Sequence, residues 1–351
     1  MSASREKVLA AISGGVDSAV AAALLIEAGC DVLGVHMLNG LSAGAAADAR
    51  RVCGLLGIEL IELDVRAEFD RLAADFAAEY ARGRTPNPCI ACNRRVKFGR
   101  LLSEADAAGA DRLATGHHAR VLQFQDGPAL VRGRAIHKDQ SYALFGIPRQ
   151  TLPRVLFPLG DMDDKALVRK IALRLGLPVH DRPDSQDVCF IPDGDYAALL
   201  AERRPEALRP GNIVNAAGDV LGRHDGYGRY TIGQRRGLGV AAGEPMYVTD
   251  IDPETATVTI GPREESLREG LSASGANWQQ DVPEAFEGLI QIRYNHPGTR
   301  GEVRLTGPGA FSARFAEPVA AVAPGQAAAV YDGDILLGGG WIDSAVPAPR
   351  G

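Results

Sequence analysis

Residues 13–18 read SGGVDS and lie between two segments of different character. The apolar segment 7–12, KVLAAI, is typical of a buried strand, and the alanine- and leucine-rich segment 19–28 is typical of a helix that Gly29 ends. A polar glycine turn between a strand and a helix suits an anion, because backbone N–H groups point outward there and the helix dipole favours negative charge. The stretch therefore predicts a phosphate-binding turn.

The side chains of this turn fit the same interpretation. Gly14 and Gly15 let the backbone approach a pyrophosphate, and Asp17 can hold a Mg²⁺ ion that bridges phosphate oxygens. Ser13 and Ser18 can donate hydroxyl groups. The string lacks the lysine of the G-x-x-x-x-G-K-[ST] loop and differs from G-x-G-x-x-G. It resembles the PP-loop of the N-type ATP pyrophosphatases, which implies ATP, magnesium, an adenylated intermediate, and AMP and pyrophosphate as products. An ordinary strand–turn–helix corner is the alternative.

The next segments predict an α/β fold with a parallel sheet. Apolar segments 31–38 and 58–65 alternate with helical patterns at 45–56 and 68–81. In such sheets the ligand lies at the carboxyl ends of the strands. That rule makes Met37 a candidate adenine contact and makes His117, after the strand that begins at Leu113, a candidate site residue.

Composition limits the possible classes of protein. The chain has 351 residues, of which 46% are hydrophobic and 23% charged, and its net charge is −6. Such a length suggests two or three domains, and such a charge argues against a surface that is basic throughout. Apolar runs stay below about 18 residues, and the first seven residues lack the apolar core of a signal peptide, so we expect a cytoplasmic protein without a membrane segment.

A change of composition near residue 200 predicts further domains. Helical patterns give way to glycine-rich, β-branched stretches, and then to short alternating segments. We expect a PP-loop domain at 1–204, a small β-rich domain at 205–272, and a C-terminal β-barrel at 273–351.

The five cysteines need separate interpretations. An odd number in a cytoplasmic chain does not indicate a disulfide framework, and Cys30 and Cys53 have apolar settings typical of buried cysteines. Cys89 and Cys92 follow two prolines, so we expect a helix to begin near Cys92 and its dipole, with nearby basic residues, to lower a thiol pKa.

Several motifs together resemble the tRNA-specific 2-thiouridylase family over nearly the whole chain. Besides the PP-loop, they are Thr85–Asn93 (TPNPxxxCN), Thr115–His117, Lys138–Gln140, Ser185–Phe190 (SQxxCF), Arg293–Tyr294 and Gly325–Gln326. The resemblance implies thiolation of C2 of the wobble uridine, with ATP adenylating the C2 oxygen. It also implies a tRNA anticodon stem-loop as partner, and a sulfur donor that is either a cysteine desulfurase relay or hydrosulfide.

The same resemblance assigns roles to individual residues. The catalytic residues it implies are Asp17, the thiol of Cys92, and Cys189, which receives the persulfide sulfur. The residues implied to contact ATP are Ala11, Ile12, Ser13, Gly14, Gly15, Val16, Asp17, Ser18, Met37 and Gly116. The residues implied to contact tRNA are Asn87, Pro88, Cys89, His117, Lys138, Asp139, Gln140, Arg293, Tyr294 and Gln326.

One departure leaves the sulfur chemistry open. The family often has aspartate at the position of Cys89, so this chain has a Cys-x-x-Cys. In one mechanism Cys189 carries a persulfide and then forms a disulfide with Cys92; in another, Cys89, Cys92 and Cys189 ligate a 4Fe-4S cluster; zinc is a third possibility. The persulfide route gives Cys89 no clear role, which favours the cluster hypothesis.

Two other functions remain open at this stage. The chain could be another PP-loop ATP-dependent ligase that acts on a small molecule. It could also be a non-catalytic, ATP-responsive, tRNA-binding iron–sulfur protein.

Overall fold

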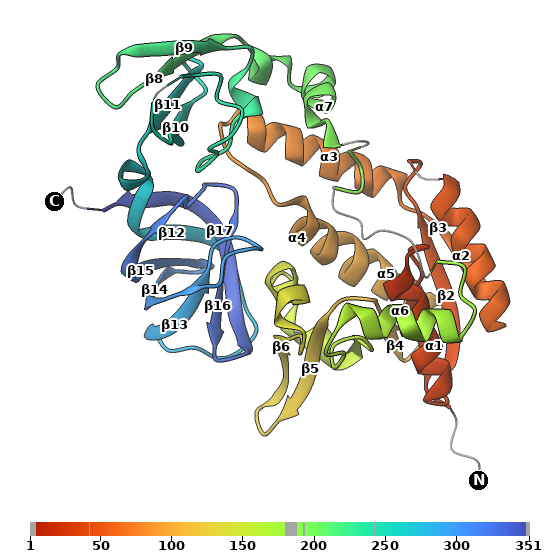
Figure 1. Ribbon diagram of the computed structural model, residues 1–351. Helices are drawn as coiled ribbons and strands as arrows, with labels where there is room; N and C mark the ends of the chain where they lie inside the picture. Colours follow the sequence, from red (N-terminus) through yellow and green to blue (C-terminus); the bar gives the residue numbers. More distant parts are fainter. Residues whose placement is uncertain (1–4, 42, 180–187, 192–193, 242, 349–351) are drawn as a thin grey trace. The chain divides into compact units, whose positions relative to one another are not determined.

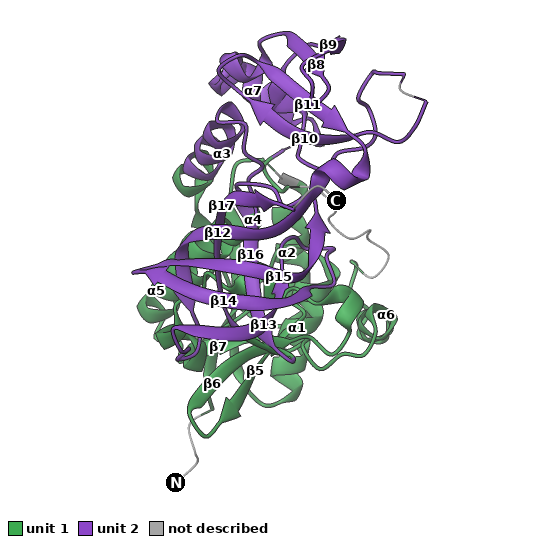
Figure 2. Cartoon of the chain, turned by 90° about the vertical axis from the view of Figure 1, so that its left-hand side faces the viewer, with its two compact units in different colours: residues 1–70, 89–190, 334–336 green, residues 71–88, 191–333, 337–351 purple. Residues whose placement is uncertain are grey.

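The computed structural model describes residues 5–41, 43–179, 188–191, 194–241 and 243–348. The chain forms two compact units, which Figure 2 shows in two colours. Unit 1 comprises residues 1–70, 89–190 and 334–336, and unit 2 comprises residues 71–88, 191–333 and 337–351. The three-domain division stays a prediction, and its boundary at residue 272 falls inside a strand, as described below.

Unit 1 is built on a five-stranded parallel sheet with the order β3-β2-β1-β4-β7 (Figure 1). Its strands are β1 (Lys7–Ala11), β2 (Asp31–Leu38), β3 (Leu60–Asp64), β4 (Arg112–Ala114) and β7 (Val155–Leu156). The central strand β1 is buried, with Val8 and Leu9 fully inaccessible. This topology confirms the predicted α/β class, and the burial of parallel strands by the surrounding helices accounts for their continuous apolar segments.

Helices connect these strands. They are α1 (Val16–Glu27), α2 (Ala43–Leu56), α3 (Arg66–Ala81), α4 (Pro88–Cys92), α5 (Leu101–Ala107) and α6 (Lys165–Arg174). Helices α1 and α6 lie side by side, and their apolar faces share one core cluster that includes Val20, Leu25, Val168 and Ala172 (Figure 1). Unit 1 also has a hairpin, β5 (Ala119–Phe124) with β6 (Gly127–Arg132), and short helices η2 (Ile136–Lys138), η3 (Ser141–Leu144) and η4 (Arg149–Arg154).

The helix expected to begin near Cys92 begins four residues earlier, so that expectation was wrong. It starts at Pro88, continues through a π-helical stretch η1 (Asn93–Arg100), and ends with α5. Proline was treated as a residue that forbids a helix. At the first helical position it is tolerated, because its missing N–H would have no intrahelical partner there.

Unit 2 contains a small sheet and a barrel. Near the sheet in sequence lie α7 (Tyr196–Arg203), η6 (Pro205–Leu208), η7 (Tyr227–Arg229) and η8 (Arg263–Ser266). The sheet, in the order β10-β11-β8-β9, contains β8 (Gly211–Val214), β9 (Val220–His224), β10 (Tyr247–Asp252) and β11 (Thr257–Gly261).

The C-terminal barrel is antiparallel and closed. Its strands are β12 (Leu267–Trp278), β13 (Ala285–Gln291), β14 (Thr299–Gly307), β15 (Ala310–Ala320), β16 (Ala327–Asp332) and β17 (Ile335–Pro347). Pairing of β12 with both β15 and β17 closes the barrel around Ile290, Val303, Phe311 and Ile342, which confirms the predicted barrel. The predicted boundary at residue 272 lies inside β12. Among the helices of the described residues, none is long and apolar enough to span a membrane.

Candidate active site

The turn at residues 13–18 is shaped by its own side chains. The Ser13 backbone N–H donates to Ser18 Oγ at 3.0 Å, and Ser18 Oγ donates to the Gly15 carbonyl at 3.0 Å. Gly14 has φ +82°, and a Cβ built there would lie 2.6 Å from the Ala45 carbonyl oxygen. The sequence therefore needs glycine at position 14 both for the backbone conformation and for the close approach of α2.

Other predicted nucleotide residues lie at the same edge of the sheet. Ala11 ends β1, Met37 lies one residue before the end of β2, and Gly116 follows β4. A Cβ at Gly116 would lie 2.8 Å from the Ser18 nitrogen, so this backbone packs directly against the start of α1. The parallel sheet thus brings the turn at 13–18 and Gly116 together, with Met37 at the neighbouring strand end. That these residues bind ATP stays a prediction.

Asp17 has two neighbours that the sequence analysis missed. Lys165 Nζ, at the first residue of α6, donates to Asp17 Oδ2 at 2.5 Å, and His118 Nε2 lies 3.6 Å from Asp17 Oδ1. Burial alone would raise the pKa of Asp17, but the interactions with His118 and Lys165 outweigh it and hold that pKa below its usual value. The chain separation of 148 residues between Asp17 and Lys165 explains why no motif spacing indicated the pair.

The Asp17 carboxylate, which pairs with Lys165 through one oxygen, has a second oxygen that suits a metal ion. Its Oδ1 atom is buried and has no hydrogen-bond partner among the described residues. A buried carboxylate oxygen whose histidine neighbour lies beyond hydrogen-bond distance is a suitable ligand for Mg²⁺, which prefers oxygen. Asp17 is therefore compatible with the magnesium role expected from the sequence.

The cysteines differ from the sequence expectation in their acidity. Cys89 and Cys189 are exposed, whereas Cys92 is buried. Burial raises the pKa of Cys92, the neighbouring Cys89 adds to the rise, and Lys97 only partly offsets it. The expected lowering of the thiol pKa is thus wrong for Cys92, because desolvation outweighs the nearby positive charge.

Cys189 is also a weakly acidic thiol. Desolvation by the surrounding atoms, together with the thiols of Cys92 and Cys89, raises its pKa to about 12. These mutual effects place the three sulfur groups in one neighbourhood of unit 1. Ser185 and Gln186, from the same predicted motif, lie outside the described residues.

The described cysteines do not belong to a group of metal-ligating side chains. Within the part of the chain that the structure describes, no three His, Cys, Asp or Glu side chains form a group that could hold a metal ion. The cysteines of that part are all free thiols. The arrangement therefore gives no support to the cluster or zinc hypotheses.

His117 is buried between two partners. Its Nδ1 lies 2.7 Å from Thr115 Oγ1 and its Nε2 lies 3.3 Å from Lys97 Nζ. Because an ammonium group can only donate, Nε2 accepts and Nδ1–H donates to the threonine. Burial, and then the charges of Lys97 and His118, hold the pKa of His117 well below its usual value, so the ring is neutral.

The segment Lys138–Gln140 has structural partners. Asp139 is buried and accepts from Arg132 Nη1 at 2.9 Å and from Ser141 Oγ at 2.7 Å. Gln140 Oε1 accepts from the backbone N–H of His118 at 2.8 Å. Gln140 thus holds the chain at His118, whereas Asp139 binds Arg132 and its own neighbour Ser141.

The predicted tRNA residues of unit 2 fall into two groups. Gln326 Nε2 donates to the carbonyls of Thr85 and Pro86, at 3.0 and 3.3 Å, so it holds the segment that contains Asn87. Arg293 and Tyr294 are exposed in the connection after β13, where a nucleic acid could reach them.

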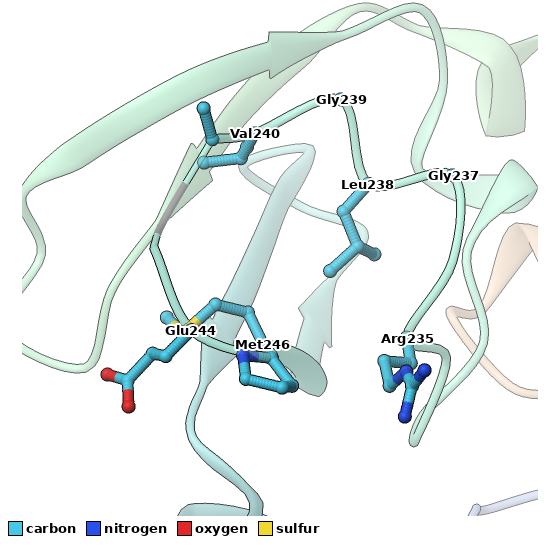
Figure 3. Close-up of a pocket in the computed structure, with 9 residues that line it drawn as sticks. Arg235, Gly237, Leu238, Gly239, Val240, Glu244 and Met246 are labelled. Atoms are coloured by element: carbon cyan, nitrogen blue, oxygen red, sulfur yellow. The ribbon is translucent and has the colours of Figure 1, made fainter.

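A hollow of about 620 Å³ lies in the loop before β10. Figure 3 shows Arg235 on one side of it, Glu244 and Met246 on the other, and Leu238 pointing between them. Arg235 and Arg236 are exposed, as are two further arginines of the small sheet region, Arg223 and Arg229. These residues are thus exposed basic side chains in a protein whose net charge is −6.

A parallel sheet with a glycine-rich turn between its central strand and a helix defines a nucleotide-binding α/β protein. Three family models match consecutive parts of the chain. They are the "tRNA methyl transferase HUP domain" at residues 6–193, the "tRNA methyl transferase PRC-barrel domain" at 197–262, and the "Aminomethyltransferase beta-barrel domain" at 268–342.

Curated relatives match over nearly the full length. The tRNA-specific 2-thiouridylase MnmA of Carboxydothermus hydrogenoformans is 48% identical, covering 97% of this chain and 98% of the relative. The MnmA proteins of Geobacter metallireducens (45% identical; 97% and 98% covered) and Syntrophotalea carbinolica (46%; 97% and 100%) are similarly close. The chain belongs to the tRNA-specific 2-thiouridylase family, and the resemblance drawn from its motifs is confirmed.

Proposed function

We propose that this chain is a tRNA-uridine 2-sulfurtransferase, a transferase that uses ATP to replace the C2 oxygen of uridine with sulfur. The identity of 45–48% to MnmA proteins over almost the whole chain carries this proposal. The SGGVDS turn at the carboxyl edge of a parallel sheet supplies the expected ATP site. The alternatives, another PP-loop ligase or a non-catalytic binding protein, are not favoured.

The first half-reaction is the adenylation of uridine. The C2 oxygen attacks the α-phosphorus of ATP, the bond from that phosphorus to the bridging oxygen breaks, and pyrophosphate leaves with the electron pair. Bound Mg²⁺ would supply positive charge to the phosphate oxygens, and Asp17 would hold it. The backbone of residues 13–18 at the start of α1 would bind the phosphates, and Gly116 would keep the first turn of α1 in place.

The second half-reaction delivers sulfur. We infer a persulfide route, in which the terminal sulfur on Cys189 attacks C2 and AMP leaves. The thiolate of Cys92 then attacks the sulfur of Cys189, the thiolated base departs, and a Cys92–Cys189 disulfide remains for an external thiol to reduce. The exposure of Cys189 supports its role as acceptor, since a cysteine desulfurase relay, which transfers sulfur already at the persulfide oxidation level, must reach it.

Binding of tRNA is proposed through local patches, with the anticodon stem-loop as the recognised element. Unstacked loop bases can be splayed out of the stem, which a reaction at C2 of a base requires. In unit 2 the exposed Arg235, Arg236, Arg293 and Tyr294 support this proposal, because arginine pairs with phosphate and tyrosine stacks on bases. A tRNA substrate also favours the cytoplasm as the location, and the division at residues 204 and 272 remains our proposal for the domains.

One assay tests the whole proposal. Purified protein, tRNA transcript, Mg·ATP and a cysteine desulfurase with cysteine should yield AMP only when tRNA is present, and digestion of the tRNA should release 2-thiouridine detectable by mass spectrometry. AMP formation that is independent of tRNA, or that depends on a small molecule, would return the assignment to another PP-loop ligase.

Cysteine variants separate the two sulfur routes. Under the persulfide route Cys92→Ser and Cys189→Ser lose thiolation but keep tRNA-dependent pyrophosphate formation, which precedes sulfur transfer, and Cys89→Ser retains most of both activities. Cys30→Ser is the matched control, because Cys30 precedes β2 at the opposite edge of the sheet. Loss of both iron and thiolation in anaerobically prepared Cys89→Ser would favour the cluster instead.

A further inference from the structure

The phosphate turn lacks a cation of its own. No lysine or arginine occurs between Lys7 and Arg50, a range that includes β1, the turn, α1 and β2. The flanking residues are occupied elsewhere, since Lys7 Nζ donates to the Ala108 carbonyl at 2.7 Å and Arg50 pairs with Glu62 at 2.6 Å. Departure of pyrophosphate places negative charge on this turn, and in other phosphate loops a lysine within the motif offsets it.

Lys165 is the cation that the fold brings to this turn. Its Nζ lies 2.5 Å from Asp17 Oδ2, and its side chain is only 12% exposed. Helix α6 fixes its position, because Asp164 caps the helix by accepting from the Ala166 N–H at 2.9 Å, while Val168 and Ala172 pack into the core shared with α1. A long side chain held at its base in this way can move its ammonium group over a short distance without moving the backbone.

Asp17 can release Lys165 when a second cation arrives. The other oxygen of Asp17 faces the buried His118, neither of whose ring nitrogens has a hydrogen-bond partner among the described residues. Mg²⁺ bound by Asp17 would neutralise the carboxylate, and the ammonium group would then find its strongest partner in the phosphate oxygens.

We propose that Lys165 is a catalytic residue of the adenylation step, which contacts the β- and γ-phosphates of ATP and stabilises the departing pyrophosphate. Asp17 holds it beside the turn before the nucleotide binds. The lysine remains protonated throughout, so no proton is transferred; it supplies charge where the phosphorus–oxygen bond breaks. This proposal rests on the proposed function for the reaction, but its test measures nucleotide binding alone.

The test compares ATP with AMP. Both contain the adenosine and the α-phosphate, but only ATP has the phosphates that Lys165 would contact. In Lys165→Ala, the affinity for Mg·ATP, measured by calorimetry without tRNA, should fall about 10- to 100-fold, while the affinity for AMP changes less than about twofold. Lys165→Arg should recover most of the loss. The matched control is Lys170→Ala, which removes an exposed lysine from the same helix.

A double variant separates contact from simple neutralisation of Asp17. The Asp17→Asn single variant, which lacks the same magnesium ligand, is the reference for the double variant Asp17→Asn/Lys165→Ala. If Lys165 only balances the charge of Asp17, the two variants should bind ATP equally well, whereas direct contact predicts weaker binding by the double variant. Equal loss of ATP and AMP affinity in Lys165→Ala, or equal ATP affinity of the double variant and Asp17→Asn, would overturn the proposal. Wild-type protein that binds ATP but forms no AMP with tRNA and a sulfur donor would contradict the proposed function and leave this inference standing.

Discussion

Replacement of Gly116 by alanine tests whether the ATP turn is positioned by the strand end behind it. The added Cβ would lie 2.8 Å from the Ser18 nitrogen, 2.9 Å from the Asp17 carbonyl carbon and 3.1 Å from the Ser18 Cα. All three are backbone atoms, so no side-chain rotation relieves the overlap. The Gly116 segment is itself fixed, because the Thr115 N–H donates to the Leu156 carbonyl and the His118 N–H to Gln140 Oε1. The start of α1 must therefore move.

The size of the effect follows from these distances. Ordinary contacts of a Cβ begin near 3.4 Å, so the turn must shift by several tenths of an ångström. Overpacking of this kind costs about 1–3 kcal/mol, and misplacement of reacting groups by about 1 Å can cost a factor of about 100 in rate. We expect Gly116→Ala to form AMP at least about tenfold more slowly than wild type.

Gly54→Ala is the control for this prediction. Gly54 lies in α2, and a Cβ built there meets nothing within 4 Å. Alanine should stabilise the helix by about 0.5–1 kcal/mol and leave the rate of AMP formation unchanged. The assay measures AMP with saturating tRNA, and circular dichroism checks that both variants are folded. A Gly116→Ala protein as active as wild type would show that the turn does not depend on this contact.

Three further predictions concern buried charge, thiol acidity and pH. Asp139→Ala leaves Arg132 buried without its carboxylate, so the free energy of unfolding, measured with urea, should fall by about 3–5 kcal/mol. The control Asp126→Ala changes an exposed residue, and its free energy of unfolding should stay within about 0.5 kcal/mol of wild type. The pKa of about 12 keeps the Cys189 thiol protonated at neutral pH. Its alkylation, measured by mass spectrometry, should therefore be slow at pH 7 and accelerate up to about pH 12. Rapid modification of Cys189 at pH 7 would contradict this expectation. Because the pKa of His117 is lowered in the folded chain, its ring binds a proton below about pH 6.5 in the unfolded chain but not in the folded chain. The free energy of unfolding should therefore be constant above about pH 7 and fall below about pH 6.5, by up to about 1.4 kcal/mol per pH unit, with a shallower slope in His117→Gln.

Much of the fold could be predicted because its signals are local. Apolar segments at 7–12 and 31–38 with helical patterns between them define parallel strands, and β1 and β2 lie within these ranges. The predicted start of the helix was wrong at Pro88 for a local reason as well. Proline can either end a helix or occupy its first position, and the hydrogen-bond partners of the following N–H groups, which decide between these cases, are not visible in the sequence.

The site was predictable only where its residues are consecutive. The SGGVDS turn could be recognised because its chemistry lies within six residues, whereas Lys165 and His118 reach Asp17 through the packing of α6 on α1 and the end of β4. The prediction of a lowered thiol pKa at Cys92 was wrong for a related reason. Positive charges near Cys92 can be counted in a sequence, but its burial, which raises its pKa, is a property of the folded chain.

The phosphate turn therefore depends on contacts with distant parts of the chain, although its motif spans only residues 13–18. Three different connections of the sheet determine its geometry: Ala45 of α2 packs against Gly14, Gly116 after β4 packs against Ser18, and Lys165 of α6 pairs with Asp17. Each contact reaches a different residue of the motif, so hydrogen bonds within the turn and three neighbouring segments together position the six residues. The motif supplies the backbone N–H groups and the carboxylate, which require adjacency in sequence. The cation that stabilises a leaving pyrophosphate needs only proximity in space, and this explains how it can come from a helix that begins 148 residues later.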